Sequence, residues 1–305
     1  MIIYSVCLLL LSACTLKGLK SQISLFFIEQ EIAVLSSETD LSKIKVALQK
    51  NISRLELMLK DDADNEDLHI YAAQAYYSYA FSFIEDVDKK RATKLYGKAF
   101  HHASAALKKQ GISSNVLQGK LIDLNQKISS LDGDAVAALY WTAVSWAKLI
   151  EMQQPNLLLL FDLRKAKILM EQVERLDSTY YYAGPDLFFA VYYASLPQYF
   201  GGDHSLALKY FSSAREFNSN RLLIVDFLQA KYLNDIKSHD QSLNEIINAP
   251  DNLYPEQALI NAVAKQKAKY LLDNPTAWRL SFQLYVEFIS WIYSIENYIN
   301  NLLKI

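Results

Sequence analysis

Apolar residues recur at three- and four-residue intervals from about Asp40 onward, and short polar breaks separate the apolar runs. This spacing places apolar side chains on one face of a helix, and the sequence has no alternating stretch long enough for a useful strand. The pattern therefore predicts an all-α fold. The segment 41–60 carries its apolar face on Leu41, Ile44, Leu48, Ile52, Leu55 and Leu59.

The acidic run at 61–67 ends this first segment and is predicted to be a solvated loop that caps the next helix. The pattern then predicts a helical hairpin with helices over 67–84 and 88–109. Small and large residues alternate in it at the spacing of a tetratricopeptide unit, in which alanines allow close helix approach and aromatic residues fill the adjacent holes. These positions are Tyr76, Tyr79, Ala80, Phe83, Ala92, Tyr96 and Ala99.

Two further hairpins of this kind are predicted. One has Ala190, Tyr193 and Ala194 on its first helix and Ala207, Phe211 and Ala214 on its second. The other, with QQPNLLLL inserted between its helices, has Trp146, Ala147, Ile150, Ala166, Met170 and Val173. The alanines at 92, 166 and 207 are 74 and 41 residues apart, which are not multiples of the ~34-residue repeat. We therefore expect a degenerate tetratricopeptide-like array of helical hairpins, an α-solenoid or bundle, over 40–274.

Composition agrees with this fold and excludes several function classes. The 305 residues include only 8 Gly and 6 Pro, too few turn-forming residues for a β-sandwich, a barrel or a glycine-rich nucleotide fold. A formal net charge of -2 gives no indication of a nucleic-acid partner. Both cysteines, Cys7 and Cys14, lie at the N-terminus, so the body is expected to lack disulfides and thiolate metal sites.

The N-terminus carries an apolar run that ends at a cysteine. Residues 1–13 read MIIYSVCLLLLSA, and Leu11-Ser12-Ala13-Cys14 resembles the lipobox of bacterial lipoproteins. The run is too short to span a bilayer, which takes about 20 residues. We predict a signal peptide over 1–13, lipidation of Cys14, and a tether with a first helix over 14–39. Thr15, in place of an aspartate after the cysteine, favours the outer membrane by resemblance to known sorting rules.

The segment 275–305 is predicted to be a separate, apolar C-terminal helix. Asn274-Pro275-Thr276 is typical of a helix start. Packing as an end cap, a subunit interface and contact with a bilayer surface are the alternatives for covering its apolar face. That face carries Leu284, Phe288, Trp291, Ile292, Ile295, Ile299 and Leu302.

The segment 196–203 is the main candidate functional site. Pro197 is expected to end or kink the preceding helix, the two glycines to allow positive φ, and Asp203 to cap the next helix. One interpretation is simple turn geometry; the other, which we test, is that the loop borders a ligand or partner surface. The candidate residues at this loop and on the preceding helix are Tyr192, Tyr193, Pro197, Tyr199, Phe200, Gly201 and Gly202.

Trp141 and Trp146 are the second candidate, as residues that line a hydrophobic channel. Five residues apart, they point to different faces of one helix, so at least one is expected in the core. The adjacent His101 and His102 diverge by about 100° on a helix and are not expected to share a metal. No G-x-S-x-G motif or catalytic cysteine is present in the sequence. We therefore predict no enzyme activity, no metal and no cofactor.

Four stretches of the chain share a pattern with one family. They are YAAQAYYSYAFSF with RATKLYGKAF between Leu57 and Leu107, the segment 138–143 with Trp146, GPDLFFAVYYASLPQYFGGDHSLALKYF, and ALINAVAKQKAKYLL at 258–272. The third is the most specific, because Gly184-Pro185, Tyr192-Tyr193, Leu196-Pro197 and Gly201-Gly202-Asp203 fall where the family has them. Together these stretches resemble the T component of TRAP transporters, a group of tetratricopeptide-like periplasmic lipoproteins. The resemblance covers roughly 40–274, and the tail after Asn274 lies outside it.

The resemblance implies a non-enzymatic accessory protein in the periplasm, anchored through Cys14 to a membrane, with the outer membrane favoured. It implies association with the periplasmic substrate-binding protein of a TRAP transporter, a homotrimer, and a channel for a hydrophobic small molecule. The alternative keeps the fold and changes the partner: a tetratricopeptide scaffold lipoprotein for outer-membrane complex assembly. A third possibility, a helical hydrolase, is supported by no catalytic motif in the sequence.

Overall fold

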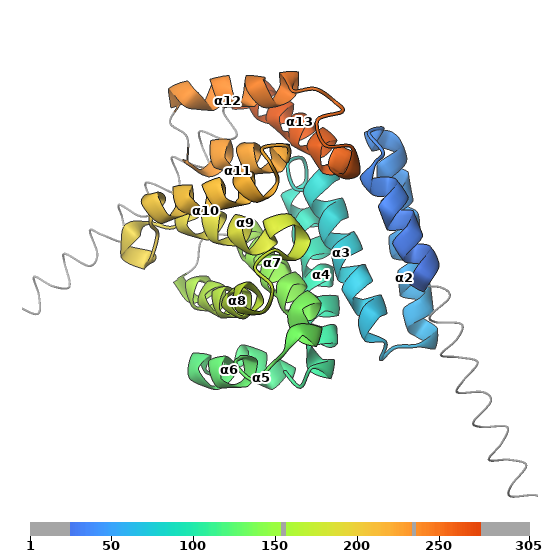
Figure 1. Ribbon diagram of the computed structural model, residues 1–305. Helices are drawn as coiled ribbons and strands as arrows, with labels where there is room; N and C mark the ends of the chain where they lie inside the picture. Colours follow the sequence, from blue (N-terminus) through green and yellow to red (C-terminus); the bar gives the residue numbers. More distant parts are fainter. Residues whose placement is uncertain (1–24, 154–156, 234–235, 276–305) are drawn as a thin grey trace, which may run out of the picture. The chain divides into compact units, whose positions relative to one another are not determined.

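The structure, a computed structural model, describes residues 25–153, 157–233 and 236–275 (Figure 1). These residues contain α-helices and short 3-10 helices and no strand, so the all-α prediction is confirmed. They divide into two compact units that meet in the chain between Asp177 and Ser178, and Pro255–Leu259 returns to the first unit. The predicted signal peptide, Cys14 and the segment 276–305 lie outside the described residues.

Unit 1 begins with a helix over 25–36, which we call the N-terminal helix. The elements that follow are α2 (Leu41–Asp61), α3 (Glu66–Phe83), α4 (Lys89–Lys109), α5 (Ser114–Gln118), α6 (Leu121–Ile128), η1 (Gly133–Ala135), α7 (Val136–Met152) and α8 (Leu157–Leu176). The short 3-10 helix η3 (Pro255–Gln257) also belongs to this unit. Helix α2 packs on α3, α3 on α4, α4 on α7 and α7 on α8, so the long helices of unit 1 pack in a continuous series.

Unit 2 contains the second predicted hairpin and the helices after it. Its elements are α9 (Tyr180–Ser195), η2 (Gln198–Phe200), α10 (His204–Phe217), α11 (Leu223–Leu233), α12 (Ile236–Asn248) and most of α13 (Ala258–Asp273). Helix α9 packs on α10 and α11, and α11 packs on α12.

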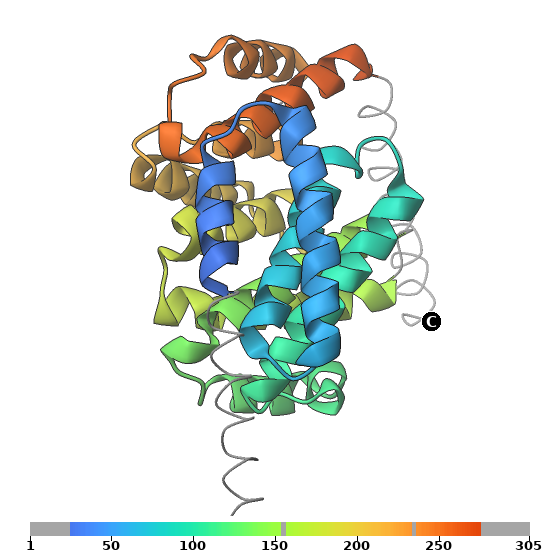
Figure 2. The same cartoon turned by 90° about the vertical axis from the view of Figure 1, so that its right-hand side faces the viewer.

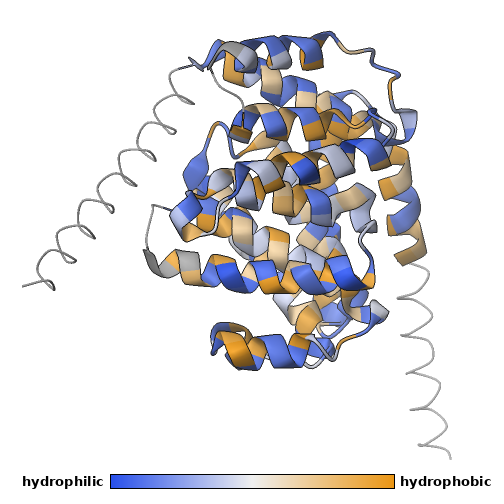
Figure 3. Ribbon diagram, turned by 60° about the vertical axis from the view of Figure 1, so that its left-hand side comes forward, coloured by the Kyte–Doolittle hydropathy of each residue, from blue (hydrophilic) through white to orange (hydrophobic). Residues whose placement is uncertain are grey.

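The small residues predicted at the helix contacts of the two hairpins are buried. Ala80, Ala92 and Ala99 in unit 1 are fully buried, as are Ala207 and Ala214 in unit 2. A methyl group at these positions lets two helices approach within the normal packing distance, and larger side chains beside it fill the space. Figure 3 shows the resulting amphipathic pattern, with apolar and polar residues on the same helices.

Side chains cap the starts of α3 and α4. The Asn65 side chain accepts from the Leu68 amide at 3.0 Å and so caps α3 from within the acidic run. The Asp88 carboxylate caps α4 through the Arg91 amide at 2.9 Å. Each side chain satisfies one of the amides that a helix N-terminus leaves without an internal partner.

One predicted boundary was wrong. The four leucines at 157–160 were assigned to an insertion between two helices, but α8 begins at Leu157 and includes them. Leucine is a strong helix former, so these residues continue the helix toward its N-terminus.

Candidate functional site

The loop between α9 and α10 makes a tight, internally hydrogen-bonded turn over Leu196–Asp203. Pro197 precedes the 3-10 helix η2, and its carbonyl accepts from the amides of Phe200 and Gly202, each at 2.9 Å. The Gly201 amide donates to the Gln198 carbonyl at 3.0 Å. These bonds fix the loop backbone in one conformation, as expected for a connection that satisfies its own polar groups.

Positions 201 and 202 require glycine for different structural reasons. Gly201 has φ +94°, the left-handed region that glycine adopts at no steric penalty, as predicted. Gly202 lacks a positive φ, so that part of the prediction was wrong for it: a Cβ there would lie 1.7 Å from the Leu196 carbonyl oxygen. The chain therefore needs glycine at 202 because backbone approaches backbone there.

Asp203 ends the loop and begins α10. Its carboxylate accepts from the Leu206 amide at 2.9 Å, which confirms the predicted N-cap. Its own amide donates to the Tyr193 carbonyl at 3.0 Å, which ties the loop to the last turn of α9. The start of α10 is thus held from both sides.

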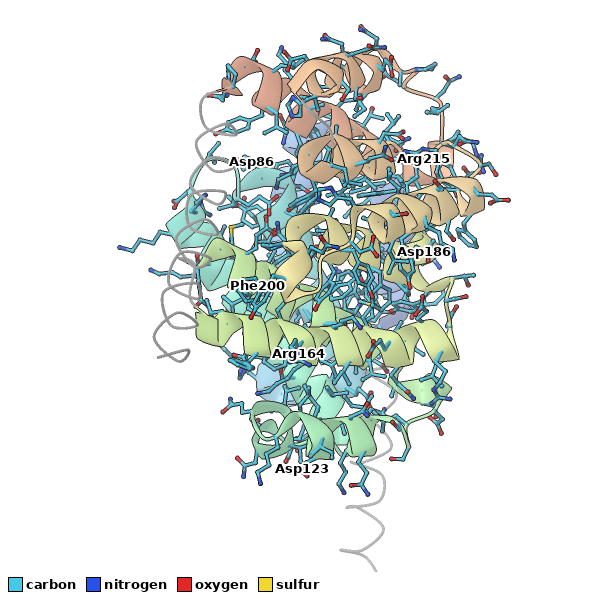
Figure 4. The ribbon with its side chains drawn as sticks, turned by 90° about the vertical axis from the view of Figure 1, so that its left-hand side faces the viewer. Asp86, Asp123, Arg164, Asp186, Phe200 and Arg215 are labelled. Atoms are coloured by element: carbon cyan, nitrogen blue, oxygen red, sulfur yellow. The ribbon has the colours of Figure 1, made fainter. Side chains whose placement is uncertain are left out.

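The loop presents one aromatic side chain to solvent. Tyr199 is 55% exposed and packs edge-on against the half-buried Phe200, with ring centroids 5.2 Å apart. Figure 4 labels Phe200. Tyr192 is buried, and Tyr193 stacks on Tyr210 of α10 at 5.9 Å. Of the predicted aromatic residues, Tyr199 is therefore the one most accessible to a partner, while Tyr192 and Tyr193 support the hairpin.

The two candidate tryptophans lie in the core of unit 1. Trp141 is buried and packs edge-on against Tyr77 at 5.7 Å. Trp146 is also buried, with its ring 5.0 Å from that of Phe100 and the Lys165 ammonium 5.8 Å from its centroid. We expected at least one of the two tryptophans in the core, and both lie there. Their role in lining a channel stays a prediction.

A buried histidine pair, which the sequence did not indicate, joins α3 to α4. His69 Nδ1 and His102 Nδ1 are 3.0 Å apart, and His69 Nε2 lies 3.0 Å from the Ala63 carbonyl oxygen. Since a carbonyl only accepts, His69 carries its proton on Nε2 and accepts at Nδ1 from His102. The contact between the two Nδ1 atoms has room for one proton, which His102 supplies, so the two rings cannot both be protonated at Nδ1.

Burial and the neighbouring carboxylate act in opposite directions on the pKa of His102, and burial has the larger effect. Burial lowers the pKa of His102 to about 4, although Glu56, with Oε1 3.4 Å from His102 Nε2, opposes the shift. Burial also lowers the pKa of His69. The Tyr76 hydroxyl donates to the same Glu56 oxygen at 2.7 Å, and both burial and this carboxylate raise the pKa of Tyr76.

A second polar feature inside unit 1 is a buried ion pair. Glu85 accepts from the Tyr96 hydroxyl at 2.5 Å and pairs with the Lys148 ammonium at 2.8 Å. Burial and the Glu85 charge raise the pKa of Tyr96, so its hydroxyl stays a donor. The three groups connect the α3–α4 turn, α4 and α7 through one hydrogen-bonded network.

The start of α9 contains a left-handed turn that the sequence also did not predict. Tyr181, Tyr182 and Ala183 have φ of 51°, 61° and 62°, a conformation that costs non-glycine residues about 1–2 kcal/mol each. The Asn218 amide holds it by donating to the Tyr182 carbonyl at 3.0 Å. The right-handed part of α9 then begins near Gly184-Pro185, where proline suits a first helical turn.

A cavity of about 310 Å³ lies among α10, α11 and α12 of unit 2. Its lining is mainly polar, and the Arg215 guanidinium is held by Asp226 at 2.8 Å and by Gln229 at 2.7 Å. Figure 4 labels Arg215. Hydrophobic ligands favour apolar walls, so this cavity does not suit one. The lining residues are Arg215, Leu223, Asp226, Gln229, Ser242, Glu245 and Ile246.

Within the described residues, no group of three or more His, Cys, Asp or Glu side chains is placed to hold a metal ion. In the same part of the chain, every helix is too short or too polar to cross a membrane.

Comparison with known proteins gives one family. No curated protein matches the chain. A family model described as TRAP transporter T-component matches residues 37–277, most of the chain and nearly all of both described units. The members of this family are components of a transporter. The chain therefore belongs to the TRAP transporter T-component family.

Proposed function

We propose that the chain acts without catalysis, as a docking protein for the periplasmic substrate-binding protein of a TRAP transporter. The observation that carries the proposal is the family match over 37–277, which includes the exposed α9–α10 loop. The described residues supply helical hairpins that hold this loop, and stacked hairpins commonly serve as rigid surfaces for partners.

The loop has the properties of a protein contact site. Tyrosine contributes a large, rigid contact area and is enriched among the residues that dominate binding energy. Tyr199 is 55% exposed, and the hydrogen bonds at Pro197 and Asp203 hold its backbone before any partner arrives. Such preorganisation lowers the entropy lost on binding. We place the centre of the docking surface at Tyr199, with Phe200 and Pro197 at its edge.

The remaining parts of the proposal follow from the sequence. Lipidation of Cys14 would hold the body at the periplasmic face of the outer membrane, and a single lipid-modified cysteine with a short tether would keep it close to that surface. Assembly as a homotrimer and exchange of a hydrophobic small molecule with the substrate-binding protein belong to the same proposal. Trp141 and Trp146 remain the candidates for a channel, which would require movement of the core around them.

The test is crosslinking of a tagged chain in intact cells, followed by mass spectrometry of the captured proteins and the mass of the uncrosslinked oligomer. We expect a periplasmic substrate-binding protein and a trimer. Replacing Tyr199 with Ser should reduce the capture strongly. Phe217→Ser is the matched control, because Phe217 is an aromatic residue of the same unit with 49% exposure, and it should leave capture unchanged.

Two outcomes would contradict the proposal. Capture of outer-membrane assembly factors with no substrate-binding protein at any crosslinker dose would favour the scaffold function instead. Equal capture of the substrate-binding protein by wild type and Tyr199→Ser would contradict the location of the docking surface but not the identity of the partner.

A further inference from the structure

The N-terminal helix, residues 25–36, is apolar on two opposite faces. One face packs on unit 1, where Ile28 is 1% exposed and Leu25 and Ile32 lie beside it. Figure 2 shows this helix, in the darkest blue, beside α2. The residues of α2 and α3 that form the rest of this cluster are Leu55, Leu59, Leu68, Ala72 and Ala75.

The outward face carries exposed aromatic and aliphatic side chains. Phe26, Phe27 and Val34 are 56%, 61% and 69% exposed, and the two phenylalanine rings are in edge contact at 5.9 Å. With Gln30 and Ala33, which are also exposed, they fall within about 120° of the helix circumference. This makes one continuous outward stripe, and Gln30 is its only polar member.

The carboxylates of the helix are engaged with the body of unit 1. Glu29 accepts from the Tyr71 hydroxyl at 2.7 Å, and Glu31 pairs with Arg54 at 2.6 Å. Both lie outside the arc that the phenylalanines occupy. The acidic groups of the helix thus contact α2 and α3, and the stripe itself carries no charge.

The position of the helix in the chain points to the occupant of this stripe. Leu25 follows Cys14 by 11 residues, which span at most ~40 Å when fully extended. The intervening segment TLKGLKSQIS contains Lys17 and Lys20 and no acidic residue, which complements anionic headgroups. A bilayer that holds the acylated cysteine is therefore within reach of the stripe.

We infer that the N-terminal helix lies on the lipid bilayer, with Phe26 and Phe27 in the boundary between headgroups and acyl chains. The inference rests on the lipid anchor of the proposed function and adds a second membrane contact to it. An apolar helix face inserts ~5–10 Å into the boundary between headgroups and acyl chains. Such a face and an acyl anchor together give stable attachment to the membrane, whereas a single weak membrane contact gives reversible binding. The contact would also fix the orientation of unit 1 toward the membrane.

The test uses the full acylated chain in vesicles of phosphatidylethanolamine and phosphatidylglycerol that contain a lipid with a nitroxide quencher. The sequence has no cysteine after Cys14, so a single added cysteine accepts an environment-sensitive fluorophore. The variants are Phe27→Cys and the control Phe161→Cys on α8, a phenylalanine with the same 61% exposure. We expect a blue shift and about a two-fold loss of emission at position 27, and neither at position 161.

Equal emission at the two positions in the acylated chain would overturn the inference and leave the anchor intact. A blue shift at position 27 without vesicles that grows with protein concentration would also overturn it, because a second copy would then cover the stripe. The mass of the N-terminal peptide reports acylation separately. An unmodified Cys14 would contradict the anchor and the inference together.

Discussion

The α3–α4 hairpin of unit 1 and the α9–α10 hairpin of unit 2 use the same small residues at their helix contacts but connect their helices differently. Five residues, 84–88, join α3 to α4, and the buried Glu85 in this turn is bonded to Tyr96 and Lys148. Eight residues, 196–203, join α9 to α10, and backbone hydrogen bonds with a required glycine fix them.

The difference shows how one packing rule can support two kinds of connection. In the first hairpin, buried side-chain charges hold the turn, so its stability should respond to substitution of those charges. In the second, the backbone itself holds the loop, and Tyr199 is exposed on the surface. A loop held in this way is suited to contact a partner, because its conformation depends little on the side chains that it exposes.

Removing the cation at the first turn should have the largest effect. Lys148→Met takes away the ammonium 2.8 Å from the buried Glu85 carboxylate, and we expect a loss of about 4 kcal/mol in the free energy of unfolding. Denaturant titration measures it. Lys148→Met combined with Glu85→Gln should recover most of the loss, since the buried charge is then gone. A single variant as stable as wild type would contradict the role of the ion pair.

Adding a methyl group to the second loop should have the next largest effect. Gly202→Ala places a Cβ 1.7 Å from the Leu196 carbonyl, and the loop must rearrange, with an expected loss of about 3 kcal/mol. Gly133→Ala is the matched control, because no atom lies within 4 Å of the added Cβ, and its effect should stay within about 0.5 kcal/mol. Similar unfolding curves for the two variants would refute the steric requirement at 202.

Acid should destabilise unit 1 through its histidine pair. In the unfolded chain, His102 binds a proton with the ordinary histidine pKa of 6.5, while in the folded chain burial holds the pKa at about 4. Its contribution to stability is therefore present above pH ~6.5 and is lost as the pH falls toward 4, with about 2 kcal/mol lost between pH ~7 and ~5. His102→Gln should remove this part of the pH dependence.

The exposed His101→Gln is the control for that measurement and should keep the pH dependence of the wild type. Unfolding curves collected at both pH values test the pair of variants. If His102→Gln and wild type lose the same stability on acidification, the neutral, buried state of the pair is wrong.

The smallest expected effect tests what the two hairpins share. Asp88 and Asp203 cap α4 and α10 in the same way, each through one amide hydrogen bond of 2.9 Å. Asp88→Ala and Asp203→Ala should each lower the free energy of unfolding by about 1 kcal/mol. A much larger loss for Asp203→Ala would show that its amide contact with Tyr193 depends on the cap, and would mark the second loop as the more cooperative of the two.

Sequence patterns predicted the hairpins because their determinants are local. The apolar period of 41–60, the caps at Asn65 and Asp203, and the alanines at the helix contacts each depend on residues a few positions apart. The exposed loop at 196–203 was found for the same reason, from its Pro197 and two glycines. The reason for glycine at 202 is the close approach of the backbone to the Leu196 carbonyl, and residue types alone do not predict that approach.

The features that the sequence missed depend on contacts between distant residues. His69 and His102 are 33 positions apart and meet only through the register of α3 against α4. The left-handed turn at Tyr181–Ala183 contains no glycine or asparagine to signal it, and its support comes from Asn218. Tertiary packing determines both features, so periodicity and local propensity cannot predict them.

The affinity of the purified chain for the substrate-binding protein recovered by crosslinking tests the central claim most directly. Calorimetry on wild type, Tyr199→Ser and Phe217→Ser gives the comparison. We predict saturable binding by wild type and by Phe217→Ser, and a loss of about 30-fold for Tyr199→Ser, the size of a hot-spot residue of about 2 kcal/mol. No binding by the wild-type chain at any concentration would contradict the docking function.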